Sequence, residues 1–105
     1  MFIGLESLET LNMSNNNLTY IDPIAFRHLE NLIYADLSNN KLTLMSNDVY
    51  DILGPVSPLH YCYRLEELYL ANNDISVLFS DWIISFYNLK ELDLSFNSFR
   101  YLEVN

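Results

Sequence analysis

One seven-residue stretch recurs four times along the chain, and this repetition constrains the fold more than any other feature. The stretches read LNMSNNN, ADLSNNK, LYLANND and LDLSFNS, and each begins three residues after a further leucine. Aligned on that leucine, four copies of the pattern LxxLxLxxN begin at Leu8, Leu32, Leu65 and Leu89, at intervals of 24, 33 and 24 residues. Because a single unit cannot bury its own leucines, we expect the units to stack into a solenoid with one shared core.

Apolar residues keep the same phase beyond the LxL segment of each unit. Two further offsets are occupied by Leu18, Leu42, Ile75 and Phe99, and by Ile21, Met45, Leu78 and Leu102. The alternation within LxL predicts a short strand with one apolar face, and stacked units place such strands in parallel, about 4.8 Å apart. The predicted fold class is an α/β solenoid: one domain over residues 1–105, with parallel concave strands and an irregular or helical convex side.

An asparagine closes each copy of the pattern, at the point where the chain leaves the strand. A buried amide must be hydrogen bonded, and here it could bond the backbone of the adjacent turns. We therefore expect an inward-pointing ladder with a structural role, made of Asn16, Asn40, Asn73 and Asn97.

The repeat resembles the leucine-rich repeat, whose known members form right-handed superhelices. A 24-residue unit with a phenylalanine before its last leucines, as in YIDPIAFRHLENL, is similar to the "typical" class of extracellular members. The segment NNDISVLFSDWIISFYNLKELDLSFNSFRYLEVN looks like part of an arthropod Toll-type receptor ectodomain. That resemblance implies a type I membrane protein that binds ligand through its ectodomain, dimerises, and signals through a cytoplasmic domain. Solenoids need polar caps, and this chain shows none at either end, so we expect an uncapped slice of a longer solenoid.

Composition excludes several classes of function. A formal net charge of −9 leaves no basic patch for nucleic acid, and it disfavours contact of this segment with an anionic membrane. The 105 residues contain one cysteine, Cys62, which falls on a core position of the repeat and is expected to be a buried thiol. We find no metal-ligand spacing, no phosphate-binding loop and no catalytic constellation. The segment is predicted to be no enzyme and to need no cofactor.

The outward positions of the concave strands are the better candidates for function. They carry four acids and no base, and two tyrosines that should be neighbours on successive strands. Aromatic rings beside fixed charges on a rigid sheet suit a protein ligand or receptor partner, although exposed strand positions can also be merely polar. The residues predicted to bind a partner are Tyr34, Asp36, Glu67, Tyr69, Glu91, Asp93 and Phe96.

Two local features add to this hypothesis. Asn12-Met13-Ser14 and Asn17-Leu18-Thr19 are glycosylation sequons, at Asn12 on a strand and Asn17 in a turn. The second unit holds nine extra residues, within 46–58, where SNDVYDIL could form a short helix and GPVSP a turn or extended segment. This insertion could contact a ligand, but a tolerated bulge on the convex side is the favoured interpretation.

The sequence thus favours recognition, as part of the extracellular ligand-binding or dimerising domain of a Toll-like cell-surface receptor. A homodimer of the full-length protein fits this hypothesis. The alternatives are a secreted, non-signalling binding protein and an intracellular scaffold, in which the sequons would stay unused.

Overall fold

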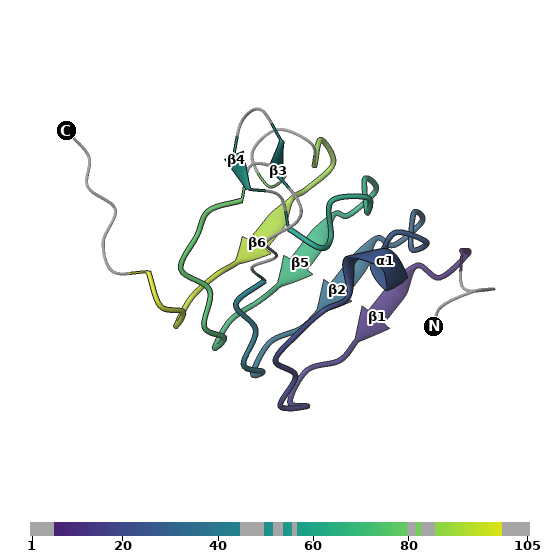
Figure 1. Ribbon diagram of the computed structural model, residues 1–105. Coiled ribbons are helices and arrows are strands. Elements are labelled where there is room, and N and C mark those ends of the chain that lie inside the picture. The colour runs from purple at the N-terminus through teal and green to yellow at the C-terminus, as the bar shows by residue number, and fades with distance from the viewer. Residues whose placement is uncertain are drawn as a thin grey trace.

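The computed structural model describes residues 6–44, 50–51, 54–55, 57–79, 82 and 86–99. Its main feature is a four-stranded parallel sheet in which each repeat contributes one three-residue strand (Figure 1). The strands lie in the order β1-β2-β5-β6, so units that follow one another in the sequence are neighbours in space. Their bounds are Thr10–Asn12 for β1, Tyr34–Asp36 for β2, Glu67–Tyr69 for β5 and Glu91–Asp93 for β6.

The strand register follows the sequence repeat residue by residue. Tyr34 pairs with Thr10 on one side and with Glu67 on the other, and Glu67 pairs with Glu91. The interval between the second and third units is 33 residues long, but it does not shift this register, because neither β2 nor β5 contains the extra residues. The predicted solenoid of parallel strands is therefore confirmed.

Each repeat forms one coil of the solenoid, and the two inner coils are those that carry β2 and β5. Their leucines form the best-buried part of the core. Leu37, Leu68 and Leu70 are 0% exposed, and so is Ala35, which stands where the other units carry leucine. Leu11 and Leu92, at the same position in the outer coils, are partly buried and pack against this core. Burial of apolar area is the main stabilising term, so each inner coil is held by the coil on either side of it.

Cys62 lies in this core, as predicted, and its thiol has no exposed surface and is in no disulfide. Its sulfur lies 3.9 Å from the carbonyl oxygen of Phe26 in the preceding unit. Cys62 thus behaves as a small apolar residue at a position where other units have leucine or phenylalanine.

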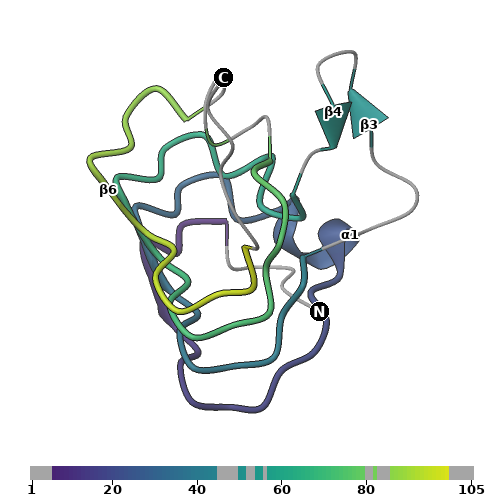
Figure 2. The ribbon, with the colours of Figure 1, turned by 90° about the vertical axis from the view of Figure 1, so that its left-hand side faces the viewer.

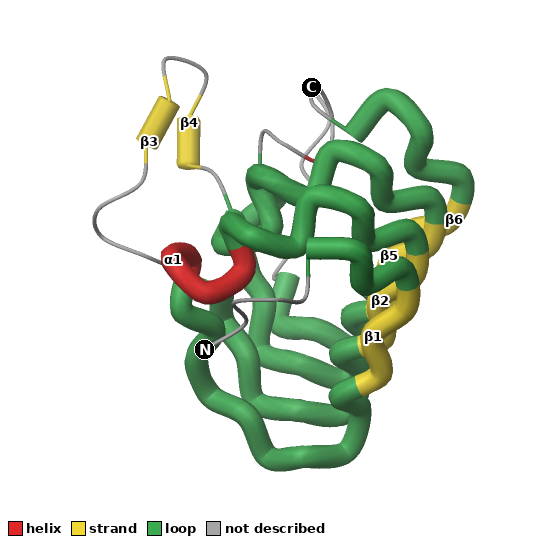
Figure 3. The backbone as a smooth tube through the Cα atoms, turned by 90° about the vertical axis from the view of Figure 1, so that its right-hand side faces the viewer, coloured by secondary structure: helices red, strands yellow, loops and turns green. Residues whose placement is uncertain are grey.

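The side of the coils away from the sheet carries the remaining elements (Figures 2 and 3). Helix α1, Pro23–Phe26, begins after Asp22, whose Oδ1 accepts the Ile24 N–H at 2.9 Å and caps the helix. The insertion forms a two-stranded antiparallel sheet on the same side as α1, made of β3, Tyr50–Asp51, and β4, Gly54–Pro55.

This small sheet corrects one prediction and agrees with another. Tyr50 and Asp51 were expected in a short helix and instead pair with Pro55 and Gly54. Pairing between strands satisfies backbone groups of both segments, which a helix of one or two turns cannot do by itself. The extended segment expected at Gly54–Pro55 is present. Residues 46–49 and 52–53, also part of the predicted helix, lie outside the described residues.

Buried asparagine side chains join each coil to the one before it. Asn73 is 6% exposed, and its Oδ1 accepts the N–H of Leu42 in the preceding coil at 3.0 Å. Its Nδ2 donates to the carbonyl of Leu37 in that coil, at 3.0 Å, and to the carbonyl of Leu70 in its own, at 3.1 Å. The Asn73 amide thereby pairs the Leu42 N–H, and it is a second donor to two carbonyls that also accept from Asn40 and Asn97.

The same pattern is found one coil earlier and one coil later. Asn40 Oδ1 accepts the N–H of Leu18 at 2.9 Å, and Asn40 Nδ2 donates to the carbonyl of Met13 at 3.0 Å. Asn97 Oδ1 accepts the N–H of Ile75, also at 3.0 Å. The ladder therefore runs through three consecutive interfaces between coils.

Asn16 departs from the predicted ladder because its side chain is exposed. Its Nδ2 donates to the Ser14 carbonyl within its own coil, at 3.0 Å. The described part of the chain contains no earlier coil whose backbone could complete the pattern. Asn16 therefore makes the local contact of the ladder without the contact between coils.

We predict that Asn73→Ala lowers the free energy of unfolding by about 2 kcal/mol, because it leaves the buried Leu42 N–H unpaired and removes one of the two amide donors to the Leu37 carbonyl. Asn16→Ala is the matched control and should change this free energy by less than about 0.5 kcal/mol, since Asn16 is exposed. Urea denaturation followed by circular dichroism measures both values. Equal losses in the two variants would contradict a ladder that acts between coils.

Candidate protein-recognition face

The side chains that project from the four strands away from the core form one continuous surface, called the sheet face below. It is the surface that the sequence predicted to be concave. In the two inner strands the middle residue is buried and the flanking residues are not. The strand register arranges the outward side chains in two rows, the first Thr10, Tyr34, Glu67 and Glu91 and the second Asn12, Asp36, Tyr69 and Asp93.

The structure brings two predicted aromatic residues together at the centre of this face. The ring centroids of Tyr34 and Tyr69 lie 5.5 Å apart, with an angle of 52° between the ring planes. Rings at this separation attract one another, and each loses little further conformational freedom on contact with a partner. The two tyrosines thus form a preorganised aromatic platform on β2 and β5.

Two carboxylates share the hydroxyl group of Tyr69. The Tyr69 hydroxyl oxygen lies 2.7 Å from Oε1 of Glu67, two residues earlier on β5. It is also hydrogen bonded to Oε2 of Glu91, on β6. A phenol has one proton to donate, so it can serve only one of these acceptors at a time. The arrangement holds two negative charges beside one neutral ring.

These contacts alter the acidity of the phenol. The hydrogen bond to Glu91, followed by that to Glu67, raises the pKa of Tyr69 well above its usual value, because both carboxylates favour the protonated hydroxyl. Tyr69 is therefore neutral throughout the physiological pH range, and it stays a hydrogen-bond donor on this face.

The acids that end strands β2 and β6 are held by the turns that follow them. Ser95 donates to Oδ1 of Asp93 from its Oγ at 2.6 Å and from its N–H at 3.0 Å. The side-chain bond, followed by the backbone bond, lowers the pKa of Asp93. Asp36 accepts the N–H of Ser38 in the same way, at 3.0 Å. Asp93 therefore keeps its negative charge under mildly acidic conditions.

Phe96 is exposed in a backbone conformation that disfavours its side chain. Its φ is 57°, in the left-handed region, and its side chain is 79% exposed. Three equivalent residues, Asn15, Asn39 and Asn72, have φ values of 61°, 59° and 57°. Asparagine tolerates this region, whereas an aromatic residue there costs roughly 1–2 kcal/mol. The fourth unit thus carries an exposed ring at a position where it does not contribute to folding.

Both sequons lie on exposed side chains. Asn12 Oδ1 accepts the N–H of Ser14 at 3.0 Å and the Ser14 hydroxyl at 2.7 Å, and the amide faces outward from β1. Asn17 lies in the following turn, with a φ of 56°. A glycan on Asn12 would cover the β1 end of the sheet face, while one on Asn17 would leave the four strands uncovered.

A second aromatic cluster, which the sequence interpretation missed, lies ahead of β5. The rings of His60, Tyr61 and Tyr63 contact one another edge to face, with centroids 5.2 to 6.2 Å apart. Tyr61 and Tyr63 are exposed, and His60 Nδ1 is buried without a hydrogen-bond partner. The spacing HYCY around the buried Cys62 is the signal that could have located this cluster.

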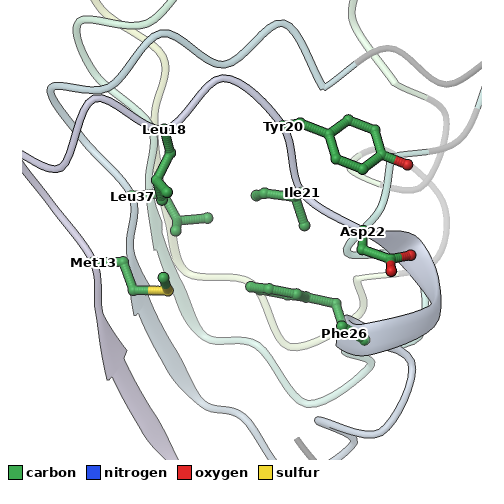
Figure 4. A pocket seen from close by; sticks show the side chains of 8 residues that line it. Met13, Leu18, Tyr20, Ile21, Asp22, Phe26 and Leu37 are labelled. Carbon is green, nitrogen blue, oxygen red and sulfur yellow. The ribbon is translucent and has the colours of Figure 1, made fainter. Parts of the chain in front are cut away.

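An apolar pocket of about 170 Å³ opens in the first coil (Figure 4). The ring of Phe26 extends from α1 toward Met13, and Leu37 closes the far side. Tyr20 and Asp22 lie at the opposite edge. Most of the lining residues belong to the hydrophobic core or pack against it, so the pocket is a continuation of the core rather than a separate polar site.

The described residues offer little else for chemistry. They hold no group of three or more histidine, cysteine or acidic side chains placed to bind a metal ion. Within the same residues, no helix has the length and apolar character needed to cross a membrane. The ion pair found there joins Lys90 to Glu66 at 3.1 Å, beside the sheet face rather than on it.

We predict that Tyr69 ionises at a higher pH than free tyrosine, whose pKa is about 10, and that Glu67→Gln with Glu91→Gln reverses this shift. Because folding raises this pKa, the stabilisation is complete below about pH 10 and is lost as the pH rises through the folded-state pKa. NMR titration of ring-labelled tyrosine measures the shift. An unchanged Tyr69 titration in the double variant would show that the carboxylates do not hold the phenol.

Comparison with known proteins places this geometry in a family. The leucine rich repeat family model matches residues 1–49 and 63–104. Adenylate cyclase of Schizosaccharomyces pombe is 34% identical over 93% of this chain, and Toll-like receptor 7 of Mus musculus is 34% identical over 86%. Human leucine-rich repeats and immunoglobulin-like domains protein 3 is 36% identical over 89% of this chain.

The chain spans a small part of each of these relatives, namely 7% of the cyclase, 8% of the receptor and 7% of the human protein. Among solved structures, internalin C2 of Listeria monocytogenes matches with a TM-score of 0.59 and 22% identity, over 96% of this chain and 48% of that one. This likeness supports the fold alone. Repeat pattern, strand register and family match agree, and the chain belongs to the leucine-rich repeat family.

Proposed function

We propose that this chain is part of the ligand-binding or dimerising ectodomain of a Toll-like cell-surface receptor. The leucine-rich repeats are a protein-interaction module, and the relatives include Toll-like receptors 7 and 3. The finer assignment, to an extracellular receptor of innate immunity, is supported by these two relatives and by the two exposed sequons.

One observation carries the proposal of a recognition surface, namely the platform of Tyr34 and Tyr69 with carboxylates fixed around it. Rigid aromatic side chains provide contact area at low entropic cost, and charged groups around them select the partner. The residues assigned to the partner contact are those predicted from sequence: Tyr34, Asp36, Glu67, Tyr69, Glu91, Asp93 and Phe96. Their contact with a protein ligand, or with a second copy of the full-length protein, is the function we propose.

A secreted, non-signalling binding protein is the alternative that keeps the same face. It is compatible with the two exposed sequons, which fit any exported protein. An intracellular scaffold is the alternative from another class, and the cyclase match favours it. The enzyme itself is not implied for this chain, because the match covers 7% of the cyclase.

The recognition surface is tested with a photoreactive phenylalanine analogue in the full-length protein. We expect crosslinks to a partner from position 96, and about tenfold fewer when Tyr69→Ala and Glu67→Lys are added, because these changes remove the platform and reverse a charge. Position 87 is the control, since Tyr87 is 85% exposed and lies before the fourth repeat, which begins at Leu89 and carries both β6 and Phe96. Crosslinks from position 87 alone would contradict recognition through the sheet face.

Localisation is tested by the state of the sequons. We expect the full-length protein from its own cells to lose mass on treatment with an N-glycosidase, because Asn12 and Asn17 are both exposed. Asn12→Gln and Asn17→Gln, made singly, identify the modified site. A mass that the enzyme leaves unchanged in the wild-type protein would favour the intracellular scaffold.

A further inference from the structure

The chemistry of the partner can be inferred from the charges on the sheet face. Glu67 and Glu91 occupy the same row on adjacent strands, and both point their carboxylates at the hydroxyl of Tyr69. Since that hydroxyl donates one proton, one carboxylate at any time faces an oxygen without a hydrogen between them. Two like charges in this position repel each other, and a cation placed between them would relieve the repulsion.

The described part of the chain does not place a basic side chain there. Lys90, the nearest base in sequence to β6, is paired with Glu66 at 3.1 Å. The Arg64 guanidinium donates to Asn31 Oδ1 at 2.9 Å. The acids on the second row, Asp36 and Asp93, add negative charge next to Tyr69 on its two flanking strands. The described residues thus leave this position open to a cation from a partner.

The aromatic platform decides which cation fits. A metal ion needs several oxygen ligands around it, and the described residues form no such group. A guanidinium group can bind carboxylates through its paired N–H donors while its flat face lies on a tyrosine ring. Tyr34 and Tyr69 supply such rings 5.5 Å apart, directly beside Glu67. An arginine side chain matches both features, whereas a lysine ammonium, which can also lie over a ring, has neither paired donors for the carboxylates nor a flat face to stack.

We propose that the protein segment that docks on the sheet face is basic, and that one of its arginine side chains binds between Glu67 and Glu91 against the tyrosine platform. This inference rests on the proposed recognition function and names the chemistry of its partner. The formal net charge of −9 speeds the approach of a basic segment from a distance, and the platform then provides the local contact. Phe96 offers an apolar contact further along the same coil.

The experiment must separate a local site from general attraction to an acidic protein. Hexaarginine is titrated into the wild-type chain and into two double variants, Glu67→Gln with Glu91→Gln, and Glu30→Gln with Asp74→Asn. Each double variant neutralises two acids, so both change the formal net charge from −9 to −7. Glu30 and Asp74 are exposed and lie outside the strands, which makes the second variant a matched control.

We expect the first double variant to lose about tenfold in affinity for hexaarginine, and the control to lose less than about twofold, by isothermal titration calorimetry. Amide chemical-shift changes should centre on β5 and β6. Circular dichroism confirms that both variants are folded. An equal loss in the two variants would overturn the proposal, because only the net charge would then matter. Hexalysine that binds as tightly as hexaarginine would overturn the assignment of arginine.

This result is independent of the test of the recognition function. If position 96 crosslinks to a partner and hexaarginine fails to distinguish the variants, the sheet face recognises a partner without a basic segment. If hexaarginine distinguishes them and crosslinks arise from position 87 alone, the arginine site exists but does not belong to the physiological interface, and the proposed function fails.

Discussion

The hydrogen bonds between asparagine side chains and the backbone of neighbouring coils are the interaction on which the rest of the structure depends. After each strand of three residues the chain turns at exposed residues such as Asn39 and returns to the core, where a backbone group such as the Leu42 N–H needs a partner. Asn40, Asn73 and Asn97 provide the missing partners and also bond the coil before them. Packing of the leucines alone would bring coils together without fixing their register, whereas these directional bonds fix it together with the backbone hydrogen bonds between the strands.

The constant register between neighbouring coils makes the sheet face a defined surface. Because adjacent strands stay in register across the longer second unit, Tyr34, Glu67 and Glu91 fall into one row although they come from different repeats. The contact between Tyr69 and Glu91 exists only in this register. A shift of one residue would turn the outward side chains into the core. The buried asparagines thus help to place the recognition residues, because they hold neighbouring coils in the register that aligns the outward side chains.

Much of the fold could be predicted from the sequence, because the repeat reports the same physical environment four times. A leucine at a fixed offset must be buried wherever the coil is repeated, and Leu37, Leu68 and Leu70 are. Asn16 differs because its environment depends on a neighbouring coil, which periodicity within one unit cannot supply. The insertion was predicted less well for a related reason. It occurs in one unit, so the helix suggested by SNDVYDIL could not be compared with the same segment in other units. In the structure, Tyr50 pairs with Pro55 in a strand instead.

The candidate site was less predictable than the fold. The outward positions followed from strand alternation, and the proximity of Tyr34 and Tyr69 followed from their register. The shared hydroxyl of Tyr69 could not be predicted, since it depends on side-chain rotamers on two strands rather than on spacing. The cluster of His60, Tyr61 and Tyr63 was missed because irregular segments impose no alternation that would sort exposed residues from buried ones.

The backbone of Phe96 has a consequence for protein engineering. A designer who averaged the four units into a consensus repeat would write asparagine there, as Asn15, Asn39 and Asn72 indicate, and would obtain a more stable chain. The averaged protein would also lose the exposed ring of Phe96, which the other three units lack at this position. In a repeat protein, the residues that the units share determine stability. The residues that differ between units determine what one surface can bind, and consensus design removes them.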